Sequence, residues 1–113
     1  MITMLKSKIH HAKVTETNLG YIGSLFIDED LLEKANIKKF EKIEVFNLTN
    51  GKNWTTYAMP AERGSGTFSV RGSASHHCKQ GDMINILVYT ITDKEEYPKM
   101  ILLDKDNHFE KYL

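Results

Sequence analysis

The chain has 113 residues and is 41% hydrophobic, which is enough for one domain with one core but not for two. Its 15 basic and 15 acidic side chains cancel without forming a block of like charge, which argues against nucleic-acid binding through a basic face. No apolar run is long enough to cross a bilayer, the first 13 residues are too basic for a signal peptide, and Cys78 is the only cysteine, so we expect a cytoplasmic protein that is bound to no membrane.

The first part of the chain predicts strands and a short helix. The strands span residues 9–15 and 21–27. Asp28 is a good N-cap, and the acidic residues after it suit the first turn of a helix. A brief helix is therefore expected from Glu29 to about Ala35, with Asn36 as its C-terminal stop.

A hairpin is the clearest element in the middle of the chain. Apolar and polar residues alternate over 42–47, and Asn50-Gly51 after them is the strongest short turn signal. Residues 54–59 then form the return strand, which we expect Pro60 to end.

The rest of the chain predicts turns and further strands. Residues 62–66 form a turn, and the small residues of 72–78 can form a helical turn. The strands span 67–70, 83–91 and 100–103, of which 83–91 is expected to be the longest. Together these elements predict a mainly β, small barrel-like domain with one or two short helices and no internal repeat.

One Gly-Ser bond is a candidate reactive site. It lies in a short apolar segment, Tyr21 to Ser24, just before the acidic helix start. Glycine reaches backbone angles that other residues avoid, so a strained turn can press the Ser24 hydroxyl against the Gly23 carbonyl. Attack there exchanges an amide for an ester, elimination leaves dehydroalanine, and hydrolysis gives a pyruvoyl group on a new N-terminus. That ketone can perform Schiff-base chemistry without a bound cofactor. A lone Gly-Ser pair is unspecific, so this interpretation depends on its surroundings.

A series of short blocks surrounds this bond in a fixed order. The blocks are residues 4–10 (MLKSKIH), 21–24 (YIGS), 27–30 (IDED), 49–52 (TNGK), 56–58 (TYA), 61–65 (AERGS), 72–74 (GSA) and 81–82 (GD). In residues, order and spacing the chain resembles the pyruvoyl-dependent aspartate 1-decarboxylases of pantothenate synthesis, from Met1 to about Ile91. The resemblance implies a single double-psi β-barrel domain over residues 1–113, cut between Gly23 and Ser24. It also implies a homotetramer with sites at subunit boundaries, and conversion of L-aspartate to β-alanine and CO₂.

The resemblance also implies a role for individual residues. Ser24 becomes the pyruvoyl group, and Tyr57 matches the acid that protonates Cα, which suits a phenol with a pKa of about 10. Thr56 matches the threonine that holds the Gly23 carbonyl during self-cleavage and contacts the substrate afterwards. The remaining matches are Tyr21 in the processing segment and Lys8, His10, Gly72, Ser73 and Ala74 in substrate binding. Taken alone, each has an ordinary explanation: a half-buried aromatic, a strand threonine, a solvated Lys or His, or loop residues.

The chain departs from the family pattern at two coupled positions. The family has arginine where this chain has Asn53, and asparagine where this chain has Arg71. Arginine binds carboxylates through a fixed fork, so its displacement should move the site of the substrate's distal carboxylate. Three hypotheses follow: the positions face each other and Arg71 binds the substrate instead, the substrate is another amino acid, or self-cleavage is impaired.

The sequence His76-His77-Cys78, with His10 and His11, raises the question of a metal site. Its spacing is wrong for a closed zinc site, and adjacent histidines on a strand point to opposite faces. We expect neither a metal nor pyridoxal phosphate, and the role of these residues and of the C-terminal tail stays open. A non-catalytic barrel that binds a metabolite or protein is the alternative from another functional class, although it has no need for Gly23, Ser24, Thr56 and Tyr57 together.

Overall fold

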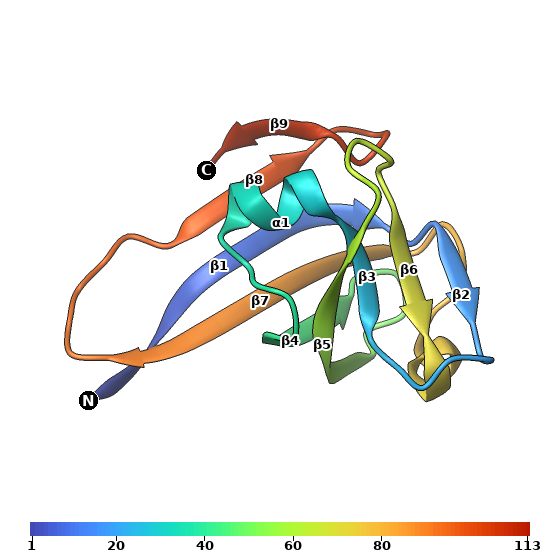
Figure 1. Cartoon of the computed structure of the whole chain (residues 1–113), viewed down its shortest axis with the longest axis horizontal. Coiled ribbons are helices and arrows are strands. Elements are labelled where there is room, and N and C mark those ends of the chain that lie inside the picture. Colours follow the sequence, from blue (N-terminus) through green and yellow to red (C-terminus); the bar gives the residue numbers. More distant parts are fainter.

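The computed structural model describes residues 1–113 as a mixed β-sheet with two short helices (Figure 1). The elements are β1 (Ile2–Lys13), β2 (Glu16–Asn18), β3 (Leu25–Asp28), α1 (Glu29–Ala35), β4 (Lys42–Asn47), β5 (Asn53–Ala61), β6 (Phe68–Arg71), the 3₁₀ helix η1 (Gly72–His77), β7 (Met83–Thr92), β8 (Lys99–Leu103) and β9 (Phe109–Tyr112). A mainly β fold with one or two short helices is confirmed. Neither helix is long or apolar enough to span a membrane.

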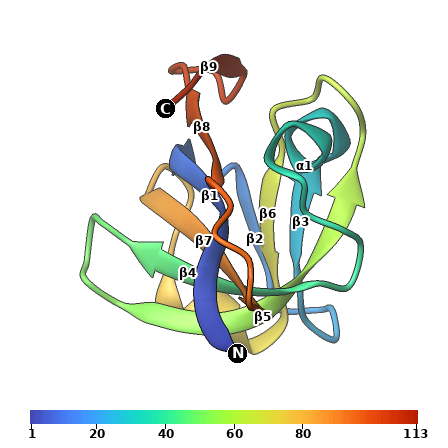
Figure 2. The same ribbon diagram turned by 90° about the vertical axis from the view of Figure 1, so that its left-hand side faces the viewer.

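The strands form one sheet in the order β2-β6-β3-β5-β4-β7-β1-β8-β9. Strand β3 runs parallel to β5 on one side and antiparallel to β6 on the other, whereas β1 lies between β7 and β8. The sheet is curved, so β1 and β7 lie on the opposite side of the molecule from β3 and β6 (Figure 2). The start of β3 and the middle of β1 therefore belong to different regions of the fold.

A single hydrophobic core of 19 buried residues fills the space enclosed by the curved sheet and α1. It follows from the alternation of the strands: Ile43 and Val45 of β4 and Ile84, Ile86 and Val88 of β7 point inward and are at most 1% exposed. Helix α1 adds Leu31, Leu32 and Ala35 to the same core. This core fixes the strands on which the predicted site residues lie.

Helix α1 begins and ends as the sequence predicts. The Asp28 side chain accepts a hydrogen bond from the Asp30 backbone N–H at 2.9 Å, and Asn36 has φ +58°, the left-handed angle typical of a C-terminal stop. The Asp28 carboxylate also accepts from the backbone N–H groups of Gly64 at 3.0 Å and Gly66 at 2.9 Å. One buried carboxylate thus joins the helix to the turn between β5 and β6.

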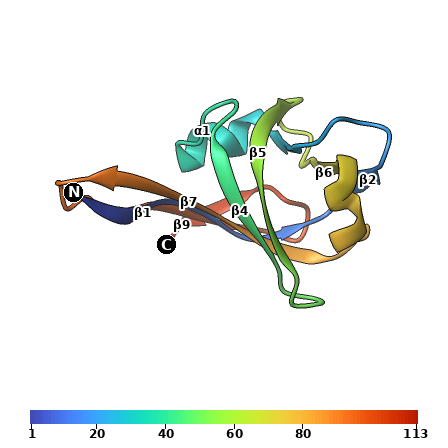
Figure 3. The same ribbon diagram turned by 90° about the horizontal axis from the view of Figure 1, so that it is seen from below.

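The longest strand is β1 with 12 residues, not β7 with 10, so that prediction was wrong. Residues 2–8 have a polar pattern that hides a strand, but they pair with β7 along its far end. This pair projects from the rest of the molecule (Figure 3). Pairing with β7 fixes this part of the strand, although its apolar and polar residues do not alternate.

The end of β5 and the presence of β9 also differ from the sequence prediction. Pro60 does not end β5, because β4 pairs with β5 only as far as Tyr57 and the strand beyond has a partner on one side only. A proline is tolerated where no ladder hydrogen bond is lost. Strand β9, which the sequence did not predict, pairs with β8 at the edge of the sheet.

Candidate active site

The Gly23–Ser24 bond forms the entry to β3 and has strained backbone angles. Gly23 has φ +153° and Ser24 has φ +99°, a value that side-chain-bearing residues rarely adopt. Ser24 is only 2% exposed, and its Oγ has no hydrogen-bond partner. A buried unpartnered hydroxyl and a positive φ are both costly, and such costs concentrate at functional sites.

The junction of β6 and η1 packs directly against this bond. Gly72 has φ +79°, and a Cβ at this position would lie 2.7 Å from the Gly23 Cα and 2.9 Å from its N. Beside it, the Arg71 backbone N–H donates to the Ser24 carbonyl oxygen at 3.0 Å. Backbone groups of one junction therefore hold both residues of the Gly23–Ser24 bond, and only glycine fits at position 72.

Strand β5 lies on the other side of the Gly23–Ser24 bond. Leu25, the first residue of β3, pairs with Ala58 of β5 in parallel register, so Tyr57 comes directly before the partner of Leu25 as Ser24 comes directly before Leu25. Thr56 precedes Tyr57 on the same strand. The Tyr57 ring is half-buried, with its centroid 5.9 Å from that of Phe40. The fold thus brings together the predicted processing and proton-donor positions.

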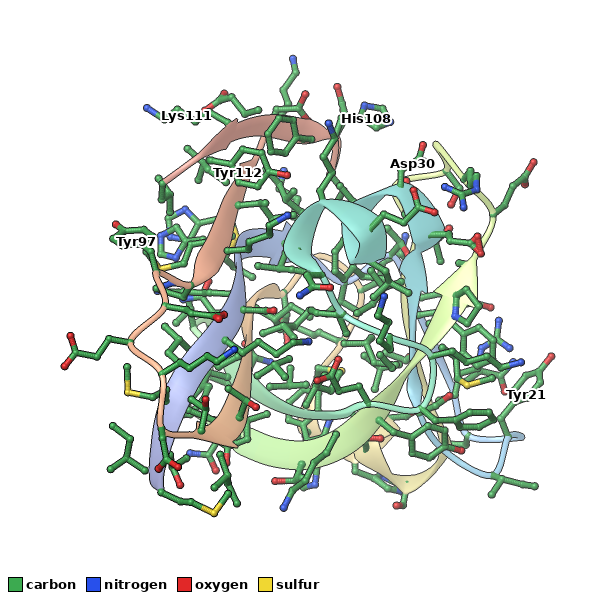
Figure 4. All side chains as sticks on the ribbon, turned by 60° about the vertical axis from the view of Figure 1, so that its left-hand side comes forward. Tyr21, Asp30, Tyr97, His108, Lys111 and Tyr112 are labelled. Atoms are coloured by element: carbon green, nitrogen blue, oxygen red, sulfur yellow. The ribbon has the colours of Figure 1, made fainter.

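The Arg71 side chain lies between two aromatic rings. Its guanidinium carbon is 4.3 Å from the Tyr21 ring centroid and 3.9 Å from the Phe26 centroid. Arg71 Nε donates to Ser69 Oγ at 3.1 Å, and Ser69 Oγ donates to a Glu16 carboxylate oxygen at 2.9 Å. Tyr21 extends from the segment before β3 at the edge of the molecule (Figure 4).

Sequence reasoning did not single out Phe26, Ser69 or Glu16. An aromatic, a serine and a glutamate on strands carry no motif, and only the pairing of β6 with β2 and β3 brings them to Arg71.

Lys8 and His10 are not brought to Ser24 within one chain. Both lie on β1, which β5, β4 and β7 separate from β3 in the sheet. The His10 ring stacks on His11 with 3.7 Å between centroids, and its Nδ1 is buried without a partner. Burial, with smaller contributions from the charges of His11 and Lys8, lowers the pKa of His10.

The exchanged residues Asn53 and Arg71 do not face each other in one chain. Asn53 is exposed at the start of β5, opposite Phe46 of β4. It precedes Tyr57 by four strand residues, or about 13 Å. Arg71 lies next to the Tyr57 end of that strand.

The segment His76-His77-Cys78 packs against β5 and accepts hydrogen bonds from the β4–β5 hairpin. The His77 ring stacks on Trp54 at 5.5 Å, and the His77 carbonyl accepts from the side-chain amides of Asn47 and Asn50. Burial raises the pKa of the Cys78 thiol to about 11, with Asp82 as a smaller cause. No three His, Cys, Asp or Glu side chains gather closely enough to hold a metal ion.

A surface pocket between α1 and β9 contains none of the predicted site residues. Asp30, His108 and Tyr112 lie along it (Figure 4). The predicted residues that the fold does bring together lie at the start of β3, with β5 and β6 on its two sides.

Comparison with known proteins gives a consistent result over nearly the whole chain. Residues 1–110 match the family model described as aspartate decarboxylase. A protein of Caldicellulosiruptor saccharolyticus named aspartate 1-decarboxylase is 44% identical over 98% of this chain and 90% of its own length. Proteins of the same name from Thermoanaerobacter pseudethanolicus and Herminiimonas arsenicoxydans are each 48% identical, over 92% and 94% of this chain and 92% of their own lengths.

Proposed function

The chain belongs to the aspartate decarboxylase family, and we propose that it acts as an aspartate 1-decarboxylase through a pyruvoyl group that it makes from Ser24. The enzyme is a carboxy-lyase that converts aspartate to β-alanine and CO₂. The observation that carries the proposed cofactor is the strained, buried Ser24 with its unpartnered hydroxyl against Gly72.

The local geometry fits the formation of a pyruvoyl group. Ser24 Oγ attacks the Gly23 carbonyl carbon, and the peptide nitrogen leaves that carbon to give an ester. Loss of the Ser24 Cα proton then expels the Gly23 carboxylate and leaves a dehydroalanine, which water converts to a pyruvoyl group and ammonia. The positive φ of Ser24 is relieved once the peptide bond before it is gone, so strain favours the cut.

Thr56 and Tyr57 supply the side chains next to this bond. Thr56, two residues before the β5 partner of Leu25, is proposed to donate a hydrogen bond to the oxygen of the attacked carbonyl, as an oxyanion donor does. The pyruvoyl group supplies a ketone that binds the substrate amine and accepts the electrons released with CO₂. Tyr57, the residue before the β5 partner of Leu25, then donates its phenolic proton to the substrate Cα.

Arg71 is proposed to bind a substrate carboxylate beside this centre. Its one hydrogen bond to the protein uses Nε, so both terminal nitrogens are free for a carboxylate. Gly72, Ser73 and Ala74 follow it in η1 and offer backbone groups close to Gly23. Because Asn53 does not face Arg71 in one chain, compensation for the exchanged arginine would have to involve another chain.

Lys8 and His10 are proposed to complete the site from a second copy of the chain. They lie on a different part of the sheet from Ser24, so one chain alone does not gather the full set. We propose a homotetramer of single-domain double-psi β-barrels in which β1 of one subunit faces the Ser24 turn of another.

Mass spectrometry of the purified chain tests self-cleavage. We expect fragments of residues 1–23 and 24–113 whose summed mass equals that of the full chain plus water minus ammonia. Ser24→Ala should stay intact because it lacks the attacking oxygen, whereas Ser73→Ala, which changes the serine of another Gly-Ser pair, should still be cut. A wild-type chain that stays intact under every condition would overturn the pyruvoyl proposal.

Mixed subunits test the shared site. Lys8→Met and Tyr57→Phe should each be nearly inactive as pure oligomers. If one site takes Lys8 from one copy and Tyr57 from another, denaturing and refolding the two variants together should restore activity in mixed oligomers. Mixtures no more active than the separate variants would show that each site uses one chain.

A further inference from the structure

The guanidinium of Arg71 contacts both sides of the bond that is proposed to break. Tyr21 is the third residue before the Gly23–Ser24 bond and Phe26 is the third residue after it. Arg71 lies 4.3 Å from the first ring centroid and 3.9 Å from the second. The same cation thus links the chain before the cut to the strand after it.

Arg71 is itself held in place from the opposite side. Its Nε donates to Ser69 Oγ, which is fully buried and donates in turn to the Glu16 carboxylate. Its backbone N–H donates to the Ser24 carbonyl. The guanidinium therefore has a fixed position, set by β6 and β2, against which the exposed segment before the bond can be held.

The segment before the bond has few other contacts. Leu19, Tyr21 and Ile22 are 60%, 50% and 101% exposed. Its contacts include a hydrogen bond from the Gly20 N–H to Asn18, the close approach of Ile22 and Gly23 to Gly72, and the Tyr21 ring against Arg71. The contact of Tyr21 with Arg71 is therefore a side-chain anchor for an otherwise exposed segment.

We propose that Arg71 is a positioning residue for self-cleavage: by holding Tyr21 and Phe26 together it keeps the Gly23 carbonyl within reach of Ser24 Oγ. A cation over an aromatic face is attracted by the ring, and the effect grows when both are partly shielded from water. The proposal rests on the proposed self-cleavage. It gives Arg71 a task before any substrate binds, so its test needs no decarboxylation assay.

The rate of self-cleavage is the first measurement. Arg71→Met keeps the length of the side chain but removes the charge, and Tyr21→Leu removes the ring from an exposed position. Each should slow the appearance of the fragment 24–113 by on the order of tenfold. Because both changes break one contact, the double variant should be little slower than either single variant. Arg63→Met changes the other arginine, which binds acidic residues of α1 far from the bond, and should cleave at the wild-type rate.

Proteolysis of an uncleavable chain is the second measurement. In the Ser24→Ala background, chymotrypsin should cut after Tyr21 faster when Arg71→Met is added, because the ring is released from the guanidinium. Addition of Arg63→Met should leave this rate unchanged. This measurement depends neither on self-cleavage nor on activity, and melting temperatures of the variants show whether they are folded.

The outcomes separate the two proposals. A wild-type chain that never cleaves overturns the pyruvoyl proposal. A wild-type chain that cleaves, with Arg71→Met and Tyr21→Leu cleaving equally fast, overturns the positioning role alone. Additive rate effects in the double variant, or equal proteolysis of the Arg71→Met and Arg63→Met chains, would also overturn it. If Arg71→Met does not fold, Tyr21→Leu, which breaks the same contact from the other side, decides by the same rate.

Discussion

Replacing Gly72 with alanine should both destabilise the fold and block self-cleavage. The new Cβ would lie 2.7 Å from the Gly23 Cα, and both atoms belong to backbone that cannot move without displacing η1 or the Ser24 turn. Gly51 offers a matched control, because it has the same φ of +79° but nothing within 4 Å of an added Cβ. The difference between the two variants isolates the collision from the backbone strain.

The expected magnitudes follow from these two terms. A left-handed φ costs a residue with a side chain about 1–2 kcal/mol, so both variants should have their free energy of unfolding lowered by this amount. The collision adds about 1–3 kcal/mol, the usual cost of overpacking, so Gly72→Ala should lose about 2–5 kcal/mol in total. Urea unfolding in the Ser24→Ala background, at one protein concentration, measures both free energies without interference from cleavage.

The rate of self-cleavage, measured in chains that keep Ser24, is the second comparison between the two glycine variants. Gly51→Ala should cleave at the wild-type rate, and Gly72→Ala should remain intact or cleave much more slowly, because the Gly23 carbonyl is displaced from Ser24 Oγ. Equal free energies of unfolding and equal cleavage rates for the two variants would refute the conclusion that Gly72 is required by its approach to Gly23.

Three further predictions follow from the site and its supports. Tyr57→Phe should still self-cleave but lose on the order of 10²-fold or more in kcat, because only the proton donor is removed, whereas Tyr89→Phe should not; normal turnover of Tyr57→Phe would assign the acid to another group. Asp28→Ala should lower the free energy of unfolding by about 2–4 kcal/mol, because it leaves the backbone N–H groups of Asp30, Gly64 and Gly66 without their acceptor. Asp106→Ala, at an exposed position, is the control, and an equal loss in the two variants would contradict this prediction. Burial lowers the pKa of His10 below 6.5, so the unfolded chain binds the proton more readily than the folded chain. The melting temperature should therefore fall as pH drops from about 6.5 through the lowered pKa, and His10→Gln should reduce this fall. A variant with the same pH profile as the wild type would exclude the effect.

Local signals in the sequence predicted much of the fold. The Asp28 cap, the Asn36 stop and the Asn50-Gly51 turn were confirmed, because each depends on the preferences of a few adjacent residues. The position of β1 was only partly predicted, since its polar half is fixed by pairing with β7 and not by its own pattern. The end of β5 was likewise not predictable from local signals, because a strand tolerates Pro60 only where β4 no longer pairs with it.

The family and its reaction could also be identified from the sequence, because the ordered blocks from residue 4 to residue 82 carry the resemblance that the comparisons confirm. The surroundings of Ser24 required the tertiary structure. Register places β5, which carries Tyr57, and β6, which carries Arg71, on the two sides of β3, and register depends on hydrogen bonds between residues distant in the chain. From the sequence, one hypothesis was that Asn53 and Arg71 face each other; within one chain the strands set them apart and place Arg71 between Tyr21 and Phe26.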